Sequence, residues 1–146
     1  ATRVAAKKER YYRLAADFFE FKEGRRTVGL FVCNAVDWST YYIRSAAVLP
    51  EYQGLRLSHG FVAFLLETLR GLGVERVEAD TSPSNFATLA ILTGFHFNVT
   101  GTTLSDRWGA QLRLTRYLDT ECEDVFLRQF CSGVIHQRRR RSGAAR

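Results

Sequence analysis

Apolar residues follow two different periods along the chain, and these periods separate the helices from the strands. Over residues 58–72 the apolar side chains recur every three or four positions, which predicts an amphipathic helix. The stripe expected to face the core consists of Phe61, Phe64, Leu65, Thr68, Leu69 and Leu72. Further helices are predicted at residues 5–16, 85–93 and 120–137. The last of these begins on a capping-box spacing formed by Thr120 and Glu123.

Short apolar stretches bounded by turn residues predict the strands, which are expected at residues 18–21, 27–35, 40–48, 74–80, 95–100 and 110–117. Residues 27–35 are apolar on both faces, as is typical of an interior strand. Short turns at Gly24 and Asp37 make the first three strands antiparallel. The helix between residues 40–48 and 74–80 makes those two strands parallel. The sequence therefore predicts an α/β fold, a mixed sheet flanked by helices, in one domain over residues 1–137.

The stretch from residue 46 to residue 58 combines the end of a strand, a turn and the start of a helix. Pro50 and Gly54 mark the turn, and the first helical turn falls near Ser58. The first N–H groups of a helix have no partner within the helix, and the helix dipole adds partial positive charge there. An anion, typically a phosphate, is therefore expected to bind there. Many α/β proteins contain such a unit without binding phosphate, so the local pattern leaves both interpretations open.

Composition places the chain among folded proteins that need neither a disulfide nor a metal. Of its 146 residues 46% are hydrophobic, yet no apolar run reaches the roughly 18 residues of a membrane span, and the first residues form no signal-peptide core. Cys33, Cys122 and Cys131 show no C-x-x-C spacing, and the last two fall on opposite faces of the predicted final helix. A cytoplasmic protein with reduced thiols and no metal site is expected.

The positive charge of the chain is concentrated at its C-terminal end. The formal net charge is +6, and Arg138, Arg139, Arg140 and Arg141 follow Ile135, the last apolar residue before this run. Such a run predicts a solvated, disordered tail over residues 138–146. The alternative is a binding segment for an acidic protein, a nucleic acid or a phosphorylated ligand.

Four consecutive segments resemble the GCN5-related N-acetyltransferase (GNAT) superfamily. They are Thr-Val-Gly-Leu-Phe-Val, Tyr-Tyr-Ile-Arg-Ser-Ala-Ala-Val-Leu-Pro-Glu-Tyr-Gln-Gly, the helix that follows, and Asp-Thr-Ser-Pro-Ser-Asn-Phe-Ala-Thr-Leu-Ala-Ile-Leu-Thr-Gly-Phe. The resemblance covers residues 28–118 and implies a sheet that splays open at the strand before the loop. Acetyl-CoA, or another acyl-CoA, would lie there against exposed backbone. The part before residue 28 is short for the family, which indicates a minimal variant or a piece of a longer chain.

The resemblance also implies which residues would hold the cofactor: Val48, Leu49, Gln53, Gly54, Leu55, Arg56, Leu57, Ser58 and Asn85. The family loop has the form Gln/Arg-x-x-Gly-x-Gly/Ala. Gln53 fits its first position, whereas Arg56 and Ser58 replace its two small residues. Arg56 would have to adopt a left-handed conformation that favours glycine, although its guanidinium could contact a phosphate. Otherwise Arg56 points to solvent in a loop that no longer binds CoA.

For catalysis, the resemblance implies that the backbone at Val48 and Leu49 polarises the thioester. The family's base position falls at Tyr42, and Asp80 is the nearest carboxylate expected to face the cleft. The corresponding ordinary roles are sheet packing for Tyr42 and a solvated charge or helix cap for Asp80. A tyrosine often serves as the acid in the second helix, where this sequence has Ala90, Ile91 and Leu92. His59 and His96 are alternatives.

Two functions are therefore expected from the residues and the resemblance. The first is an acyl-CoA-dependent N-acyltransferase that moves an acetyl group to an amine acceptor within a ternary complex. The second is a catalytically degenerate GNAT-fold binding or regulatory module, whose segment Arg138–Arg141 contacts an acidic protein or nucleic acid. A domain of a larger enzyme and a homodimer are also left open, and no membrane partner is expected.

Overall fold

The computed structural model describes residues 3–131 of the chain. Its elements are α1 (Arg3–Leu14), β1 (Asp17–Glu23), β2 (Arg26–Ala35), β3 (Thr40–Val48), the 3-10 helix η1 (Pro50–Tyr52), α2 (Leu57–Gly71), β4 (Arg76–Thr81), α3 (Phe86–Gly94), β5 (Asn98–Ser105), β6 (Gly109–Tyr117) and α4 (Thr120–Phe130). The predicted basic tail, residues 138–146, lies outside the described residues. So does the predicted continuation of the last helix to residue 137.

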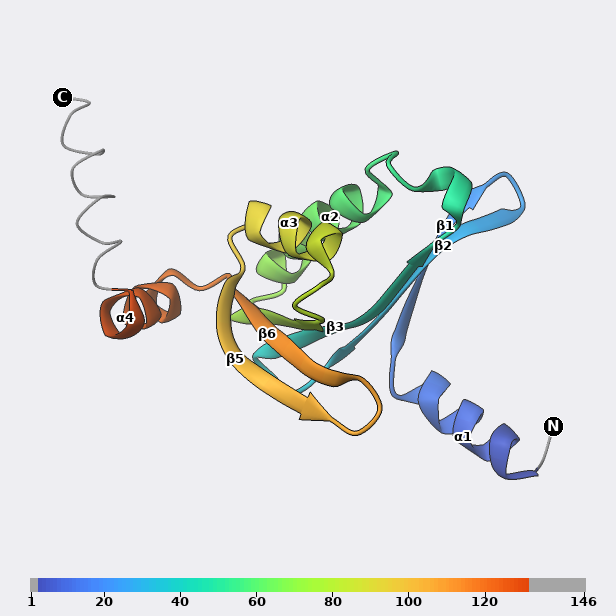
Figure 1. The fold of residues 1–146 in the computed structure, drawn as a ribbon, viewed down its shortest axis with the longest axis horizontal. Helices are drawn as coiled ribbons and strands as arrows, with labels where there is room; N and C mark the ends of the chain where they lie inside the picture. Colours follow the sequence, from blue (N-terminus) through green and yellow to red (C-terminus); the bar gives the residue numbers. More distant parts are fainter. Residues whose placement is uncertain (1–2, 132–146) are drawn as a thin grey trace.

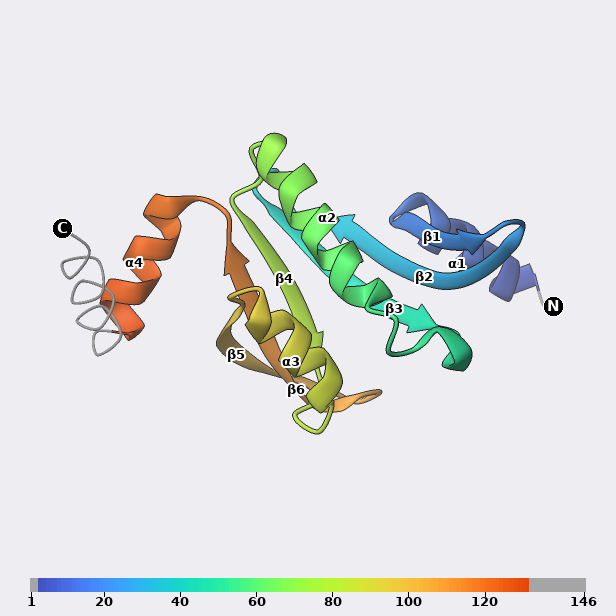
Figure 2. The same cartoon turned by 90° about the horizontal axis from the view of Figure 1, so that it is seen from above.

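Six strands form one mixed sheet in the order β1-β2-β3-β4-β6-β5, which confirms the predicted fold class. Helices α2 and α3 lie together on one face of this sheet, and α1 lies on the side away from them (Figures 1 and 2). Strand β3 pairs with β2 along its length but pairs with β4 only from Thr40 to Ile43. Beyond Ile43 the two strands diverge (Figure 2). The sheet is therefore open between the second half of β3 and the end of β4.

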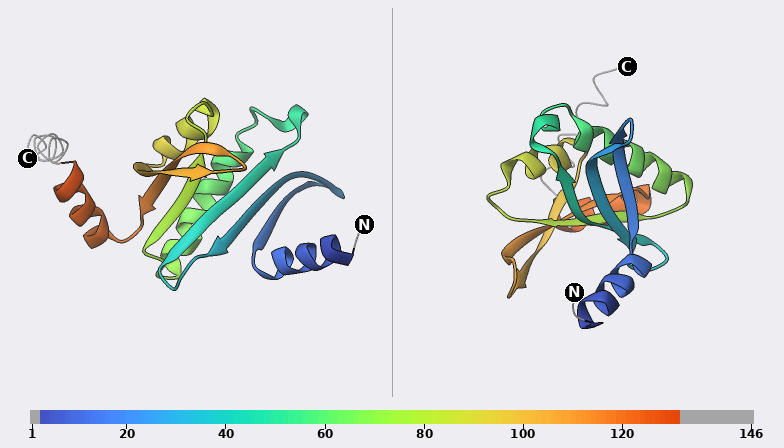
Figure 3. Two further views of the ribbon diagram at one scale, coloured as in Figure 1. Left: turned by 60° about the horizontal axis from the view of Figure 1, so that its bottom comes forward. Right: turned by 90° about the vertical axis from the view of Figure 1, so that its right-hand side faces the viewer.

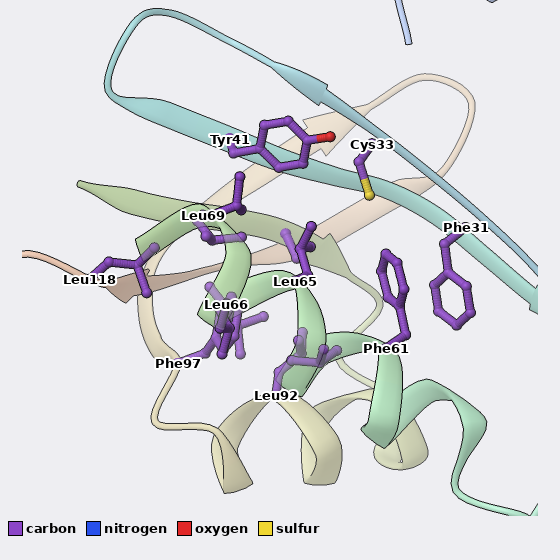
Figure 4. Packing of buried hydrophobic residues seen from close by; sticks show 14 residues of the cluster. Phe31, Cys33, Tyr41, Phe61, Leu65, Leu66, Leu69, Leu92, Phe97 and Leu118 are labelled. Carbon is purple, nitrogen blue, oxygen red and sulfur yellow. The ribbon is translucent and has the colours of Figure 1, made fainter. Parts of the chain in front are cut away.

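The core lies between the sheet and α2 (Figure 4). The helix buries Phe61, Val62, Leu65, Leu66 and Leu69. The predicted stripe was correct at Phe61, Leu65 and Leu69 but wrong at its other three positions, because Phe64, Thr68 and Leu72 are exposed. A helix this apolar offers more than one stripe of suitable spacing, and the contact with the sheet selects which one is buried.

Aromatic side chains fix the N-terminal end of α2 against the sheet. The rings of Phe31 on β2 and Phe61 on α2 stack with centroids 4.0 Å apart, and Phe19 and Phe21 of β1 meet Phe61 edge-on at 5.2 and 6.1 Å. Such aromatic pairs contribute about 0.5–1.5 kcal/mol beyond the area they bury. Because Phe61 follows the first turn of α2 directly, this packing holds the loop before the helix in place.

Several element boundaries differ by one to three residues from those predicted, such as α1, which begins at Arg3 and ends at Leu14 where residues 5–16 were expected; two further differences have a clear cause. Strand β5 was placed at residues 95–100 but runs from Asn98 to Ser105, because its polar second half pairs with the start of β6. Helix α4 is capped by the side chain of Asp119, which accepts a hydrogen bond of 2.9 Å from the N–H of Cys122, and not by Thr120. A better cap one residue upstream replaces the expected one.

Helices α1 and α4 extend from opposite ends of the sheet (Figures 1 and 3). The guanidinium of Arg44 on β3 lies over the ring of Tyr12 at 5.0 Å, which ties α1 to the face of the sheet opposite α2. Within residues 3–131, none of the helices combines the length and the apolarity that crossing a bilayer requires.

Candidate functional site

The loop between β3 and α2 ends on a residue in the left-handed conformation. Arg56 is the N-cap of α2 with φ 60° and ψ 22°, and Gly54 before it has φ 83°. For a residue other than glycine this conformation costs about 1–2 kcal/mol. Arg56 thus adopts the backbone geometry that the small residue of the family loop would provide, and its side chain turns back to donate to the ring Nε2 of His59 at 3.1 Å.

The first turn of α2 presents backbone N–H groups that have no acceptor. The first hydrogen bond of the helix runs from Gly60 N to Arg56 O at 2.9 Å, and no side chain caps the helix. Among the described residues, none accepts a hydrogen bond from the N–H of Leu57, Ser58 or His59. These donors and the helix dipole together make a site for an anion.

Contacts to the β1–β2 hairpin hold this loop. Arg26 pairs with Glu51 at 2.5 Å, and the hydroxyl of Tyr52 donates to Glu23. The guanidinium of Arg26 also lies 5.8 Å from the centre of the Tyr52 ring. Each exposed pair contributes little alone, about 0–1 kcal/mol, but together they limit where the loop can move.

The backbone of β3 decides which amides face the opening in the sheet. Leu49 N donates to Val28 O of β2 at 3.0 Å, so the expectation that the N–H of Leu49 faces the cleft is wrong. In an antiparallel pair the N–H groups alternate sides, and those of Val48 and Ala46 therefore point away from β2. On that side the carbonyl oxygen of Val48 accepts a hydrogen bond of 3.2 Å from Nε2 of Gln53. Ala46 was missed, although the two-residue period counted back from Val48 would have indicated it.

Two neighbouring cavities form a continuous cleft between β3, the loop and α3. The larger has a volume of about 570 Å³ and runs along the anion site, and the smaller, of about 190 Å³, lies where β3 and β4 separate. Both are lined by Ala46, Ser58, Thr88 and Ile91. A cleft of this size is in the range of small-molecule and cofactor sites.

Most of the residues predicted to bind the cofactor lie on this cleft. The larger cavity is lined by Val48, Gln53, Gly54, Arg56, Leu57 and Ser58. Leu49 and Leu55 line neither cavity, and the side chain of Leu55 is exposed. Asn85 lines the smaller cavity and caps α3, with Oδ1 accepting from Thr88 N at 3.2 Å.

The two candidate catalytic residues meet on neighbouring strands. The hydroxyl of Tyr42 on β3 donates to Asp80 Oδ2 on β4 at 3.2 Å. Arg113 on β6 binds both oxygens of Asp80, each at 2.9 Å, and its guanidinium lies 5.9 Å from the centre of the Tyr42 ring. Sequence reasoning missed Arg113, because it does not reveal that β6 lies beside β4.

The electrostatics of this cluster limit its chemistry. Burial, followed by the negative charge of Asp80, raises the pKa of Tyr42 to about 12, so the phenol is neutral at neutral pH. It can donate a hydrogen bond but cannot itself act as a base there. Asp80 lines the smaller cavity, yet a proton reaching its carboxylate competes with the bidentate hydrogen bonds from Arg113.

None of the side chains of α3 that line the cleft is a usual general acid. Ala87, Thr88 and Ile91 line it, and Ala90 is exposed. Of the two histidines considered, His59 lines the larger cavity and packs on Phe95 at 4.5 Å, whereas His96 lines neither cavity. Within residues 3–131, no three His, Cys, Asp or Glu side chains are placed to hold a metal ion.

Comparison with known proteins gives one family and many similar folds. Residues 3–97 match the model of the Acetyltransferase (GNAT) family. Similar solved structures include an IAA acetyltransferase from Bacillus cereus (TM-score 0.64, 18% identity, 79% of this chain and 86% of that one). A Bacillus subtilis acetyltransferase in complex with CoA matches with TM-score 0.64 and 16% identity over 79% and 85% of the two chains. The ribosomal-protein-S18-alanine N-acetyltransferase from Escherichia coli matches with TM-score 0.63 and 16% identity over 72% and 70%. No curated protein sequence matches the chain.

Proposed function

The chain belongs to the GNAT acetyltransferase family, and from that premise we propose that it is an acyl-CoA-dependent N-acyltransferase that moves an acetyl group from acetyl-CoA to an amine. The observation that carries this proposal is the continuous cleft from the unpartnered amides of α2 to the opening between β3 and β4. The CoA complex of the structurally similar Bacillus subtilis protein supports it.

In the proposed complex the pyrophosphate of CoA accepts hydrogen bonds from the N–H groups of Leu57, Ser58 and His59. The pantetheine arm follows β3, where the alternate amides of Ala46 and Val48 have no strand partner on the cleft side. The thioester then reaches the point where the strands separate. There the N–H of Ala46 or Val48 would hydrogen bond the carbonyl oxygen, which becomes an oxyanion during transfer.

The proposed reaction is direct transfer. The amine nitrogen attacks the thioester carbonyl carbon, the carbonyl electron pair moves to oxygen, and the carbon–sulfur bond breaks as the carbonyl reforms. The amine loses one proton to the Tyr42–Asp80 pair, acting as a unit, and the CoA thiolate takes up a proton. The hydroxyl of Thr88, which lines both cavities, is the donor placed to hydrogen bond that thiolate.

The alternative is a family member that binds a ligand or partner without catalysis. The ion pair between Arg113 and Asp80 favours it, because it occupies both oxygens of the nearest carboxylate. The absence of an acidic side chain on the part of α3 that faces the cleft favours it as well. The predicted contact of Arg138–Arg141 with an acidic protein or nucleic acid belongs to this alternative.

Calorimetric titration with acetyl-CoA, CoA and pantetheine tests the proposal. We expect acetyl-CoA and CoA to bind and pantetheine to bind more weakly, since it lacks the pyrophosphate that the α2 amides would hold. Transfer is then measured as release of free CoA thiol in the presence of peptide and polyamine acceptors. A folded protein that binds no CoA at millimolar concentration would refute the enzyme, and tight binding without transfer to any amine would favour the alternative.

A further inference from the structure

A second groove lies beside α4, at the far end of the molecule from the cleft between β3, the loop and α3. It has a volume of about 520 Å³ and is lined by Glu75, Arg76, Tyr117, Asp119, Glu121, Cys122, Val125, Phe126, Gln129 and Phe130. Figure 1 shows that α4 stands away from the sheet. The lining residues place the groove between this helix and the adjoining ends of β4 and β6. The proposed acyl transfer uses none of these residues.

One wall of the groove is apolar and incompletely covered. Phe126 packs on Tyr117 with ring centroids 5.2 Å apart, and Phe130 packs on Phe126 at 5.5 Å. Nevertheless Phe130 is 73% exposed and Val125 is 47% exposed. Exposed apolar side chains beside a groove are typical of a surface that another segment covers.

The lining residues near the start of α4 form a second, acidic wall. Glu75, Asp119 and Glu121 line it, and Arg76 is the one cation among the lining residues. Arg76 does not balance the three carboxylates, because it lies 3.7 Å from Glu75 only and its Nε has no hydrogen-bond partner among the described residues. Burial and the neighbouring Asp119 and Glu75 raise the pKa of the Cys122 thiol, as expected in an electronegative groove. The groove therefore suits an occupant that carries both apolar and cationic side chains.

We propose that this groove binds the C-terminal segment of the same chain, with Val134 and Ile135 against the aromatic wall and Arg138–Arg141 against the carboxylates. The chain leaves α4 at Phe130, which is itself a lining residue, so the segment starts at the rim of the groove. Apolar residues precede the arginines in the order that the two walls require.

The length of the segment fits this path. Returning along α4 from Phe130 to Glu121 covers about 14 Å at the helical rise. A chain from Cys131 to Arg138 extends up to about 23 Å, which is sufficient for the turn and the return. Four guanidinium groups then face three carboxylates, and fork-shaped hydrogen bonds between such groups are the strongest that side chains offer.

Hydrogen exchange of the α4 amides measures this docking in the full chain. The test compares the natural tail with two variants in which Arg138–Arg141 are all replaced by Lys or all by Glu. The intrinsic exchange rates of α4 are the same in all three, because its own sequence is unchanged. We expect the natural and Lys tails to slow the exchange of α4 at least about fivefold relative to the Glu tail at low salt, and 0.5 M NaCl to remove most of that difference.

A charge exchange identifies the groove as the binding surface. Glu75→Lys, which lies outside α4, leaves two carboxylates against two cations in the groove, so it should remove most of the difference in α4 protection between the natural tail and the Glu tail. Circular dichroism and acetyl-CoA binding check that each variant is folded. Equal exchange of α4 in all variants would overturn the proposal. Protection that grows with protein concentration would overturn it as well, since the occupant would then be the tail of a second copy.

Discussion

Replacing Arg56 separates the backbone strain of the loop from the contribution of the guanidinium. Arg56→Ala removes the side chain beyond Cβ but keeps the penalty of φ 60°, whereas Arg56→Gly removes both. The left-handed conformation costs the Ala variant about 1–2 kcal/mol, which the Gly variant avoids. The greater freedom of Gly in the unfolded chain, however, lowers the stability of the Gly variant by about 0.4–1 kcal/mol. We expect the Gly variant to be about 0.5–1 kcal/mol more stable than the Ala variant, or about 2–4 °C in Tm.

The same two variants test how the loop holds a phosphate. If backbone amides supply most of the hydrogen bonds, Arg56→Ala should weaken CoA binding by less than about tenfold, or 1.4 kcal/mol. The guanidinium is exposed and already bonded to His59, so its contribution should be below the about 1.5–3 kcal/mol of a full charged hydrogen bond. Isothermal calorimetry gives the affinities, and urea denaturation gives the stabilities.

Either measurement can refute the reasoning. A Gly variant less stable than the Ala variant would mean that residue 56 is not left-handed in solution. A loss of CoA affinity of about a hundredfold or more in Arg56→Ala would mean that the guanidinium, and not the row of amides, carries the binding. Arg70→Ala is the matched control, because Arg70 is exposed in the last turn of the same helix and should change neither quantity.

The remaining predictions concern three other positions of the site. Asp80→Asn should lower kcat by about 10²–10⁴-fold if the Tyr42–Asp80 pair accepts the amine proton, while Glu67→Gln on the exposed face of α2 should not, as followed by thiol release. The raised pKa of Tyr42 means that the unfolded chain loses this proton first, so stability is complete below pH 10 and falls as the pH rises towards about 12. Tyr42→Phe should make that fall shallower in urea titrations between pH 9 and about 12, and a slope identical to the natural protein would contradict the assignment. Asn85→Ala should cost about 1 kcal/mol through loss of the cap on α3, and Asn85→Asp should retain it, as measured by thermal unfolding; equal Tm values for the two would speak against the cap.

Local patterns were sufficient for most of the elements. The bounds of β3 and the start of α3 within one residue of Asn85 follow from residues that are neighbours in the chain, because turn chemistry and periodicity act over a few residues. Predictions were less accurate where contact with another element decides where an element ends or which of its faces is buried. Strand β5 continues to Ser105 because β6 pairs with it, and the buried stripe of α2 includes Val62 and Leu66 because of how the helix meets the sheet.

For the candidate site the same division holds. The sequence by itself determined that a strand, a turn at Gly54 and a helix follow one another, and hence that unpartnered amides gather before α2, because helix ends always leave such groups. Only the tertiary structure decided that Val48 and not Leu49 turns its N–H to the cleft, since the hydrogen-bonding register with β2 sets that choice. It also decided that Arg113 binds Asp80, because residues on strands far apart in sequence meet only through the order of the sheet.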